Sequence, residues 1–130
     1  MKNPQEYYRQ LGNLMYCTAS VDGKIASKEW AELRRLVRDE LVPAEKNSDE
    51  FGSDAAFAVE FQFDVLEGND ASFEQALDEA EMYLRHNASL LSEYDRNRMF
   101  HACEKVAVAF HGISKKENTF LQKLLTLLQK

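Results

Sequence analysis

The chain has 130 residues, of which 45% are hydrophobic and 29% are charged, and its formal net charge at pH 7 is −6. This length and composition predict a single globular domain over residues 1–130 with one substantial core. No window approaches about 20 uninterrupted apolar residues, so no membrane span is expected. The first residues lack the apolar core of a signal peptide, which favours a cytoplasmic location.

Charge is distributed unevenly along the chain. Residues 39–81 contain fourteen acidic residues and one lysine, whereas the segments on either side carry an excess of basic residues. An acidic middle repels phosphate, so nucleic acid is not an expected partner. The basic cluster Arg34, Arg35 and Arg38 is expected to pair with this acidic segment.

The first half of the chain is dominated by helical periodicity. Apolar residues in 4–20 recur at three- and four-residue steps, which predicts an amphipathic helix with a proline near its first turn. A close helix crossing is one reason for Gly12 in this helix. A second helix is predicted over residues 26–42 and ends at Pro43, and residues 43–53 are predicted to form a loop.

The phenylalanine-rich segment 56–66 fits two patterns. Phe57, Phe61 and Phe63 belong to an alternation typical of a strand, but the same residues also fit two adjoining faces of a helix. We predict a helix, because no second strand candidate exists and an isolated strand leaves its backbone groups unsatisfied. These aromatic side chains, together with Phe73 and Trp30, are interpreted as core.

The remaining residues predict three more helices. Ser72–Gln75 is a capping box that opens a helix to about His86, and a long helix follows over about 90–110. Ser114–Glu117 is a second capping box and starts the last helix. The fold class is therefore all-α, a compact bundle of about six to eight helices.

A faint internal repeat relates the two ends of the chain. A shift of 88 residues places Ile25 on Ile113 and Glu29 on Glu117. In both places one helix ends, a tight turn with glycine follows, and a glutamate lies in the first turn of the next helix. The pattern predicts two pseudo-repeated helical hairpins.

The turn at residues 22–29 is similar to the second half of a calcium-binding EF-hand loop. In such a loop a glycine permits the sharp turn, a hydrophobic residue follows two positions later, and a glutamate six positions after the glycine reaches the ion. Gly23, Ile25 and Glu29 hold these three relations.

Two interpretations of this turn stay open. In one, Asp22 and Glu29 supply oxygen ligands to a divalent cation, Ca²⁺ or Mg²⁺. In the other, Asp22 bonds the amides of the turn and Glu29 caps the following helix. Thr18 and Ser20 stand where an EF-hand has its first carboxylates. Because calcium takes about 6–8 oxygen ligands, a site here is expected to be weak.

The same turns give the chain a resemblance to the TerB-like family of all-helical bacterial domains, which is named for a tellurite-resistance protein. Residues 18–29 and 106–117 carry it: each has a helix end of small residues, a turn, an isoleucine and a glutamate. The resemblance implies a helical bundle that acts by binding and is linked to metal or general stress responses. It also points to Asp22 and Glu29 as a metal-binding surface.

Catalytic motifs are not evident. Cys17 and Cys103 lie among apolar neighbours and are expected to be buried free thiols. His86, His101 and His111 are interpreted as surface or capping residues. We therefore expect a non-enzymatic binding domain with a protein partner, and a homodimer if an outer helix keeps an exposed apolar patch. The alternatives are an EF-hand-like calcium sensor and a metal-dependent hydrolase.

Overall fold

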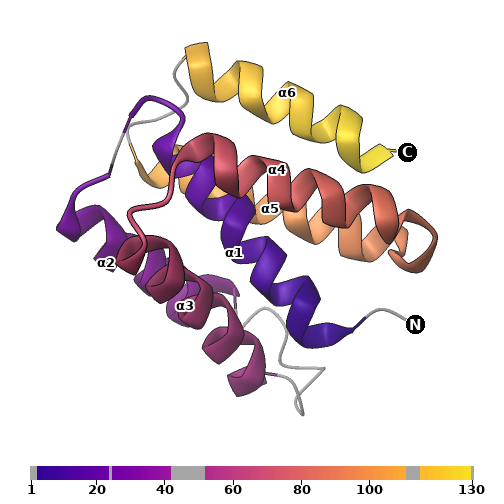
Figure 1. Cartoon of the computed structure of the whole chain (residues 1–130), viewed down its shortest axis with the longest axis horizontal. Coiled ribbons are helices and arrows are strands. Elements are labelled where there is room, and N and C mark those ends of the chain that lie inside the picture. Colours follow the sequence, from indigo (N-terminus) through magenta and orange to yellow (C-terminus); the bar gives the residue numbers. More distant parts are fainter. Residues whose placement is uncertain (1–2, 24, 42–51, 111–114, 130) are drawn as a thin grey trace.

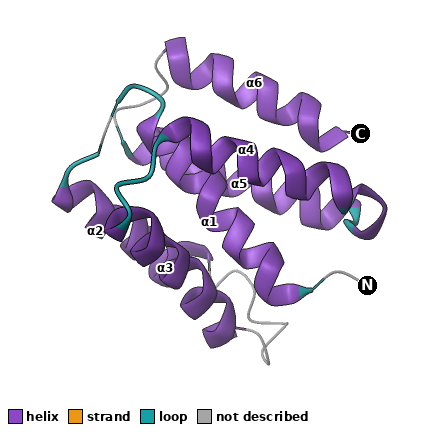
Figure 2. Ribbon diagram, in the orientation of Figure 1, coloured by secondary structure: helices purple, strands orange, loops and turns teal. Residues whose placement is uncertain are grey.

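A computed structural model describes residues 3–23, 25–41, 52–110 and 115–129 of the chain. Within these ranges six α-helices pack together and no strand is present, which confirms the all-α class (Figures 1 and 2). The helices are α1 (Pro4–Ser20), α2 (Ser27–Leu36), α3 (Gly52–Gly68), α4 (Phe73–His86), α5 (Glu93–Ala109) and α6 (Lys115–Gln129). None of the helices in the described ranges is both long enough and apolar enough to cross a bilayer.

The central element is α1, and its predicted range of 4–20 is confirmed. Every residue from Leu11 to Ser20 is buried, and α3, α4 and α5 pack around this helix (Figure 1). The helix begins at a side-chain cap, because Oδ1 of Asn3 accepts hydrogen bonds from the backbone N–H groups of Gln5 and Glu6. This cap satisfies two amides that have no partner within the helix.

The crossing of α1 and α3 is close at Gly12, as the sequence suggested. A Cβ atom added to Gly12 would lie 3.2 Å from Cβ of Gln62 and 3.3 Å from the backbone oxygen of Val59. Both atoms belong to α3, so the missing side chain lets the two helix backbones approach. The glycine therefore has a packing reason that offsets its poor helix propensity.

The second predicted helix is divided in the structure. The α-helical part, α2, ends at Leu36, and the chain continues as a π-helical turn, η1 (Val37–Leu41). Most of the predicted loop 43–53 lies outside the described residues. Its last part is wrong, because α3 already begins at Gly52. The helix α3 starts before the apolar residues whose spacing predicted it.

The prediction of a helix over residues 56–66 is confirmed, but two of its aromatic side chains are not core. Phe57 is 72% exposed and Phe61 is 51% exposed, and the two rings stack on each other with centroids 6.4 Å apart. They are one helical turn apart on the outer side of α3. The inner side of this helix buries a different set: Ala58, Val59, Gln62, Phe63 and Leu66.

The capping boxes place the starts of α4 and α5. Oγ of Ser72 accepts from the backbone N–H of Gln75, and the Gln75 side chain accepts from the backbone N–H of Ser72, as predicted. A capping box that was not predicted joins Ser92 and Asp95 in the same way. It moves the start of α5 from about 90 to Glu93, after a short 3₁₀ turn, η3 (Ala88–Leu90).

The last helix, α6, packs mainly on α5 and meets α4 along one side. In Figure 1 it lies at the top of the molecule, away from α2 and α3. Residues 111–114, which precede it, lie outside the described residues, and with them His111, Ile113 and Ser114. The repeat relation between the two hairpins therefore stays a prediction.

Candidate functional site

The predicted turn has the geometry expected for a helix start. Gly23 has a φ of +135°, a conformation that suits glycine, and its N–H donates to the carbonyl oxygen of Ser20 at 2.9 Å. Oε1 of Glu29 accepts from the backbone N–H of Ala26 at 2.7 Å, and the Glu29 N–H donates to the Ala26 carbonyl at 2.9 Å. Glu29 thus caps α2, as one of the two interpretations predicted.

The two carboxylates proposed as metal ligands have different surroundings. Asp22 is exposed at the turn, whereas Glu29 is half-buried and directs one oxygen at the α2 amide. In the described part of the chain, no group of three or more His, Cys, Asp or Glu side chains is placed to hold a metal ion. A small cavity of about 130 Å³ lies nearby, but its acidic lining residues are Glu67 and Asp70.

Of the histidines and cysteines noted in the sequence, two histidines lie on the surface and both cysteines lie in the core. His86 and His101 are exposed, and Nδ1 of His101 lies 3.8 Å from Oε1 of Glu104 on the same helix. Cys17 and Cys103 are buried and free. Burial raises the pKa of the Cys103 thiol to about 12, against a smaller lowering by its hydrogen bond with Thr18, and burial also raises the pKa of the Cys17 thiol. Both thiols are therefore protonated at neutral pH and are poor nucleophiles.

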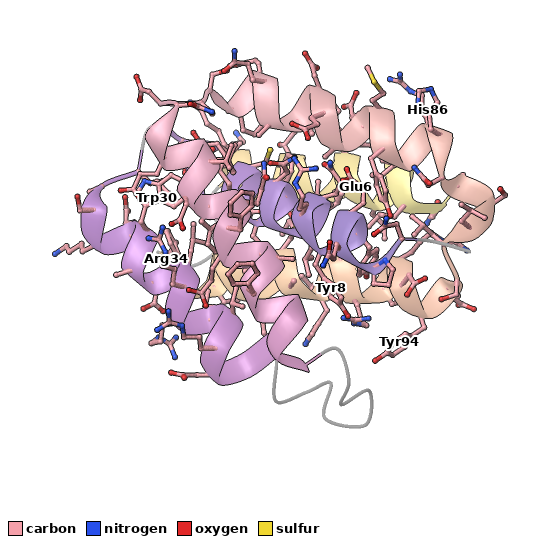
Figure 3. The ribbon with its side chains drawn as sticks, turned by 60° about the horizontal axis from the view of Figure 1, so that its bottom comes forward. Glu6, Tyr8, Trp30, Arg34, His86 and Tyr94 are labelled. Carbon is pink, nitrogen blue, oxygen red and sulfur yellow. The ribbon has the colours of Figure 1, made fainter. Side chains whose placement is uncertain are left out.

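Arg34 and Arg38 pair with the acidic segment, as predicted, whereas Arg35 is bound mainly by Glu32 on its own helix, at 2.7 Å. Arg34 bridges to Asp64 at 2.6 Å and to Glu67 at 3.4 Å, and Arg38 binds Glu60 at 2.8 Å. Figure 3 shows Arg34 on α2, on the side toward α3. These contacts join the first hairpin to α3.

A larger feature is an open apolar groove between α4 and α6, with a cavity volume of about 430 Å³. Its floor consists of Val21 after α1, Phe73 and Leu77 on α4, and Phe120 on α6. The Phe73 and Phe120 rings meet edge to face with centroids 5.7 Å apart. Positions 73 and 77 are one turn apart on α4, so the helical period places both side chains along one wall.

The edge of this groove is basic. Lys115, Lys116, Thr119 and Lys123 line it from successive turns of α6. Oγ1 of Thr119 donates to the Lys115 carbonyl at 3.0 Å, so its hydroxyl is used within the helix. The groove therefore combines an apolar floor with three ammonium groups, an arrangement suited to an apolar ligand that also carries negative charge.

The sequence analysis interpreted Phe73 as a core residue but did not identify the lysines. One signal for them was available. Lys115 and Lys116 occupy the first turn of α6, where the helix dipole disfavours positive charge. A local rule broken in this way often marks a functional position.

In comparisons with known proteins, no family model, curated protein or solved structure matches the chain. The resemblance to TerB-like domains therefore rests on the two turn motifs.

Proposed function

We propose that this chain is a non-enzymatic helical binding domain that holds an acidic, amphipathic helical segment of a partner protein in the groove between α4 and α6. The observation that carries this function is the apolar floor of Val21, Phe73, Leu77 and Phe120 beneath a lysine edge. An amphipathic helix placed in an apolar groove is a common mode of protein recognition.

The charge of the groove selects this partner. Lys115 and Lys116 are exposed, and no side-chain ion pair or hydrogen bond joins either of them to another described residue. Carboxylates that flank the apolar face of a bound helix would meet these ammonium groups, while its apolar side chains would cover Phe73 and Leu77. Burial of that apolar area supplies the affinity, and the charges favour the correct partner.

The described titratable groups support binding over catalysis. Glu29 caps a helix, the arginines of the first hairpin hold carboxylates, and the two thiols are buried and protonated. By its resemblance to TerB-like domains, we further propose that the domain acts in the bacterial cytoplasm in a metal or general stress response.

Blocking the groove tests this function. Two threonines on α6, Thr119 and Thr126, are both exposed and both donate to the carbonyl four residues earlier, but only Thr119 lines the groove. The probe is a fluorescein-labelled, lactam-constrained helical peptide with leucines along one face and glutamates beside them. Saturable binding that Thr119→Trp weakens at least about tenfold and Thr126→Trp leaves unchanged supports the function.

Three outcomes would contradict it. The first is an absence of saturable binding, and the second is equal binding by both tryptophan variants. The third is a concentration-dependent dimer that Thr119→Trp abolishes in sedimentation experiments, since it would identify a second copy of this chain as the occupant. Circular dichroism of each variant confirms that the helices are retained.

The cation proposal at Asp22 has a separate test. The variant Glu29→Gln keeps a side-chain oxygen that can cap α2, because glutamine also serves at this capping-box position. It removes only the negative charge. Calorimetric titration with Ca²⁺, Mg²⁺ and Mn²⁺ should give heat that Glu29→Gln and Asp22→Ala each abolish. Heat that neither variant changes, or no heat at all, would leave Glu29 a capping residue only.

A further inference from the structure

The two ends of the groove differ in charge, although lysines line both. At one end, Lys115 and Lys116 extend from the first turn of α6, and neither side chain is joined to a described acidic group. At the other end, Nζ of Lys123 lies 3.4 Å from Oε2 of Glu81 on α4. Glu81 also binds Arg85 at 3.4 Å and is largely buried. The charge of Lys123 is thus partly compensated within the protein, by a carboxylate that it shares with Arg85.

The backbone of α6 adds to this difference. The first N–H groups of a helix carry a partial positive charge equivalent to about half an elementary charge. Lys115 and Lys116 lie in that turn, so their exposed side chains add to the backbone contribution, whereas the one carboxylate of the same turn, Glu117, is buried and does not line the groove. Lys123 lies eight positions after Lys115, about 12 Å further along the axis of α6. Positive potential therefore falls along the groove from the start of α6 toward Lys123.

From this we infer the direction in which a partner is bound: the segment runs antiparallel to α6, with its carboxyl end and its acidic side chains over Lys115 and Lys116. A helix carries partial negative charge at its carboxyl end, which favours this direction over the reverse. Apolar side chains in the preceding turns then cover Phe73, Leu77 and Phe120. This inference rests on the proposed binding function and specifies the partner as a helix acidic at its carboxyl end.

Two peptides of equal composition test the direction. Both are lactam-constrained helices with the same leucine face, but one carries three glutamates in its last turn and the other carries them in its first turn. We expect the first peptide to bind about three- to tenfold more tightly, the range for two or more exposed ion pairs. The preference should shrink at 1 M salt, where charges are screened beyond about 3 Å.

Substitutions locate the effect within the groove. The double variant Lys115→Gln, Lys116→Gln should still bind both peptides, but with a much smaller preference between them, because only the backbone contribution of α6 remains. Lys123→Gln is the matched control and should keep the preference, since its charge is paired with Glu81 in the free protein. A nitroxide on the carboxyl end of the first peptide should broaden the amide resonances of residues 115–119 more than those of residues 123–127.

The outcomes separate the two levels of inference. If neither peptide binds, the proposed function fails and the direction fails with it. If both bind equally, if the second binds more tightly, or if the nitroxide broadens residues 123–127 more strongly, the direction is wrong and the groove function stands. A preference that the double lysine variant leaves undiminished also overturns the direction, because the charge then acts elsewhere.

Discussion

Asn13 on α1 and Gln62 on α3 meet in the interior, where Nε2 of Gln62 donates to Oδ1 of Asn13 at 2.7 Å. The two residues are 0% and 1% exposed. Nδ2 of Asn13 donates to the Gln10 side chain at 2.8 Å, and Nε of Arg9 donates to Oε1 of Gln62 at 3.1 Å. The network reaches the surface through Glu6, which accepts from both Arg9 and Gln10. A polar chain therefore crosses the α1–α3 interface beside Gly12.

Replacing Gln62 with leucine should destabilise the protein by about 1–3 kcal/mol, because the buried Asn13 oxygen loses its donor. The double variant Asn13→Leu, Gln62→Leu should cost less than the sum of the single variants, since both halves of the bond are then removed. Urea unfolding measures the free energies. Gln122→Leu, at an exposed position on α6, is the control and should change stability by less than about 0.5 kcal/mol. Strictly additive losses would show that the bond is not coupled.

Glycine substitution should give opposite signs at two sites. Gly12→Ala gains helix propensity, but its Cβ would meet two α3 atoms at 3.2 and 3.3 Å, so the helices must separate. We expect a net loss of about 1–2 kcal/mol, within the range for an overpacked core. Gly68→Ala meets nothing within 4 Å and should gain about 0.4–1 kcal/mol. Thermal and urea midpoints measure both changes, and a stabilising Gly12→Ala would show that α3 moves freely.

The sequence predicted the elements whose apolar residues follow one helical period. In α1 that period, with Pro4 at the start, gave the observed bounds, and the box at Ser72 gave the start of α4. The helix α3 was harder, because apolar residues occupy several of its faces. The pattern shows that Phe57 and Phe61 share a face, but only the position of α1 on the other side decides that this face is exposed.

The interior polar network and the groove could not be predicted from the helical periodicity of the sequence. Gln10, Asn13 and Gln62 are polar residues that usually face water, and they are buried because they satisfy one another across two helices. The groove is a space between α4 and α6, so it depends on how far apart those helices pack. Of the two predicted site residues, Glu29 caps α2, and this role was predictable because it depends only on residues close in sequence.

Removing the hydroxyl group from each of two buried tyrosines should change the stability of the protein in opposite directions. The Tyr7 hydroxyl donates to the backbone oxygen of Asp95 at 2.6 Å, whereas the buried Tyr83 hydroxyl has no hydrogen-bond partner among the described residues. Tyr7→Phe should therefore cost about 1 kcal/mol, and Tyr83→Phe should stabilise the protein by about 1 kcal/mol. Chemical denaturation of both variants at pH 7 checks this pair. Destabilisation by Tyr83→Phe would mean that its hydroxyl is bonded in solution.

Alkaline pH should destabilise the fold through the buried thiol of Cys103. Its pKa is raised by burial to about 12 from an ordinary value of 9.0, so the folded state keeps the proton after the unfolded chain has lost it. Because the unfolded state then binds fewer protons, stability is fully present below pH 9.0 and is lost as pH rises toward about 12. Burial acts on Tyr83 in the same direction, with a pKa raised from 10.0 to about 12.

The slope of unfolding free energy against pH separates the thiol from general alkaline effects. Urea unfolding between pH 8 and pH 10 should show falling stability in the unmodified protein and a shallower fall in Cys103→Ala. Val106→Ala removes a buried side chain from the same helix without removing an ionisable group, so it should lower stability at every pH and keep the original slope. If Cys103→Ala keeps that slope as well, the thiol is not the group whose ionisation is linked to unfolding.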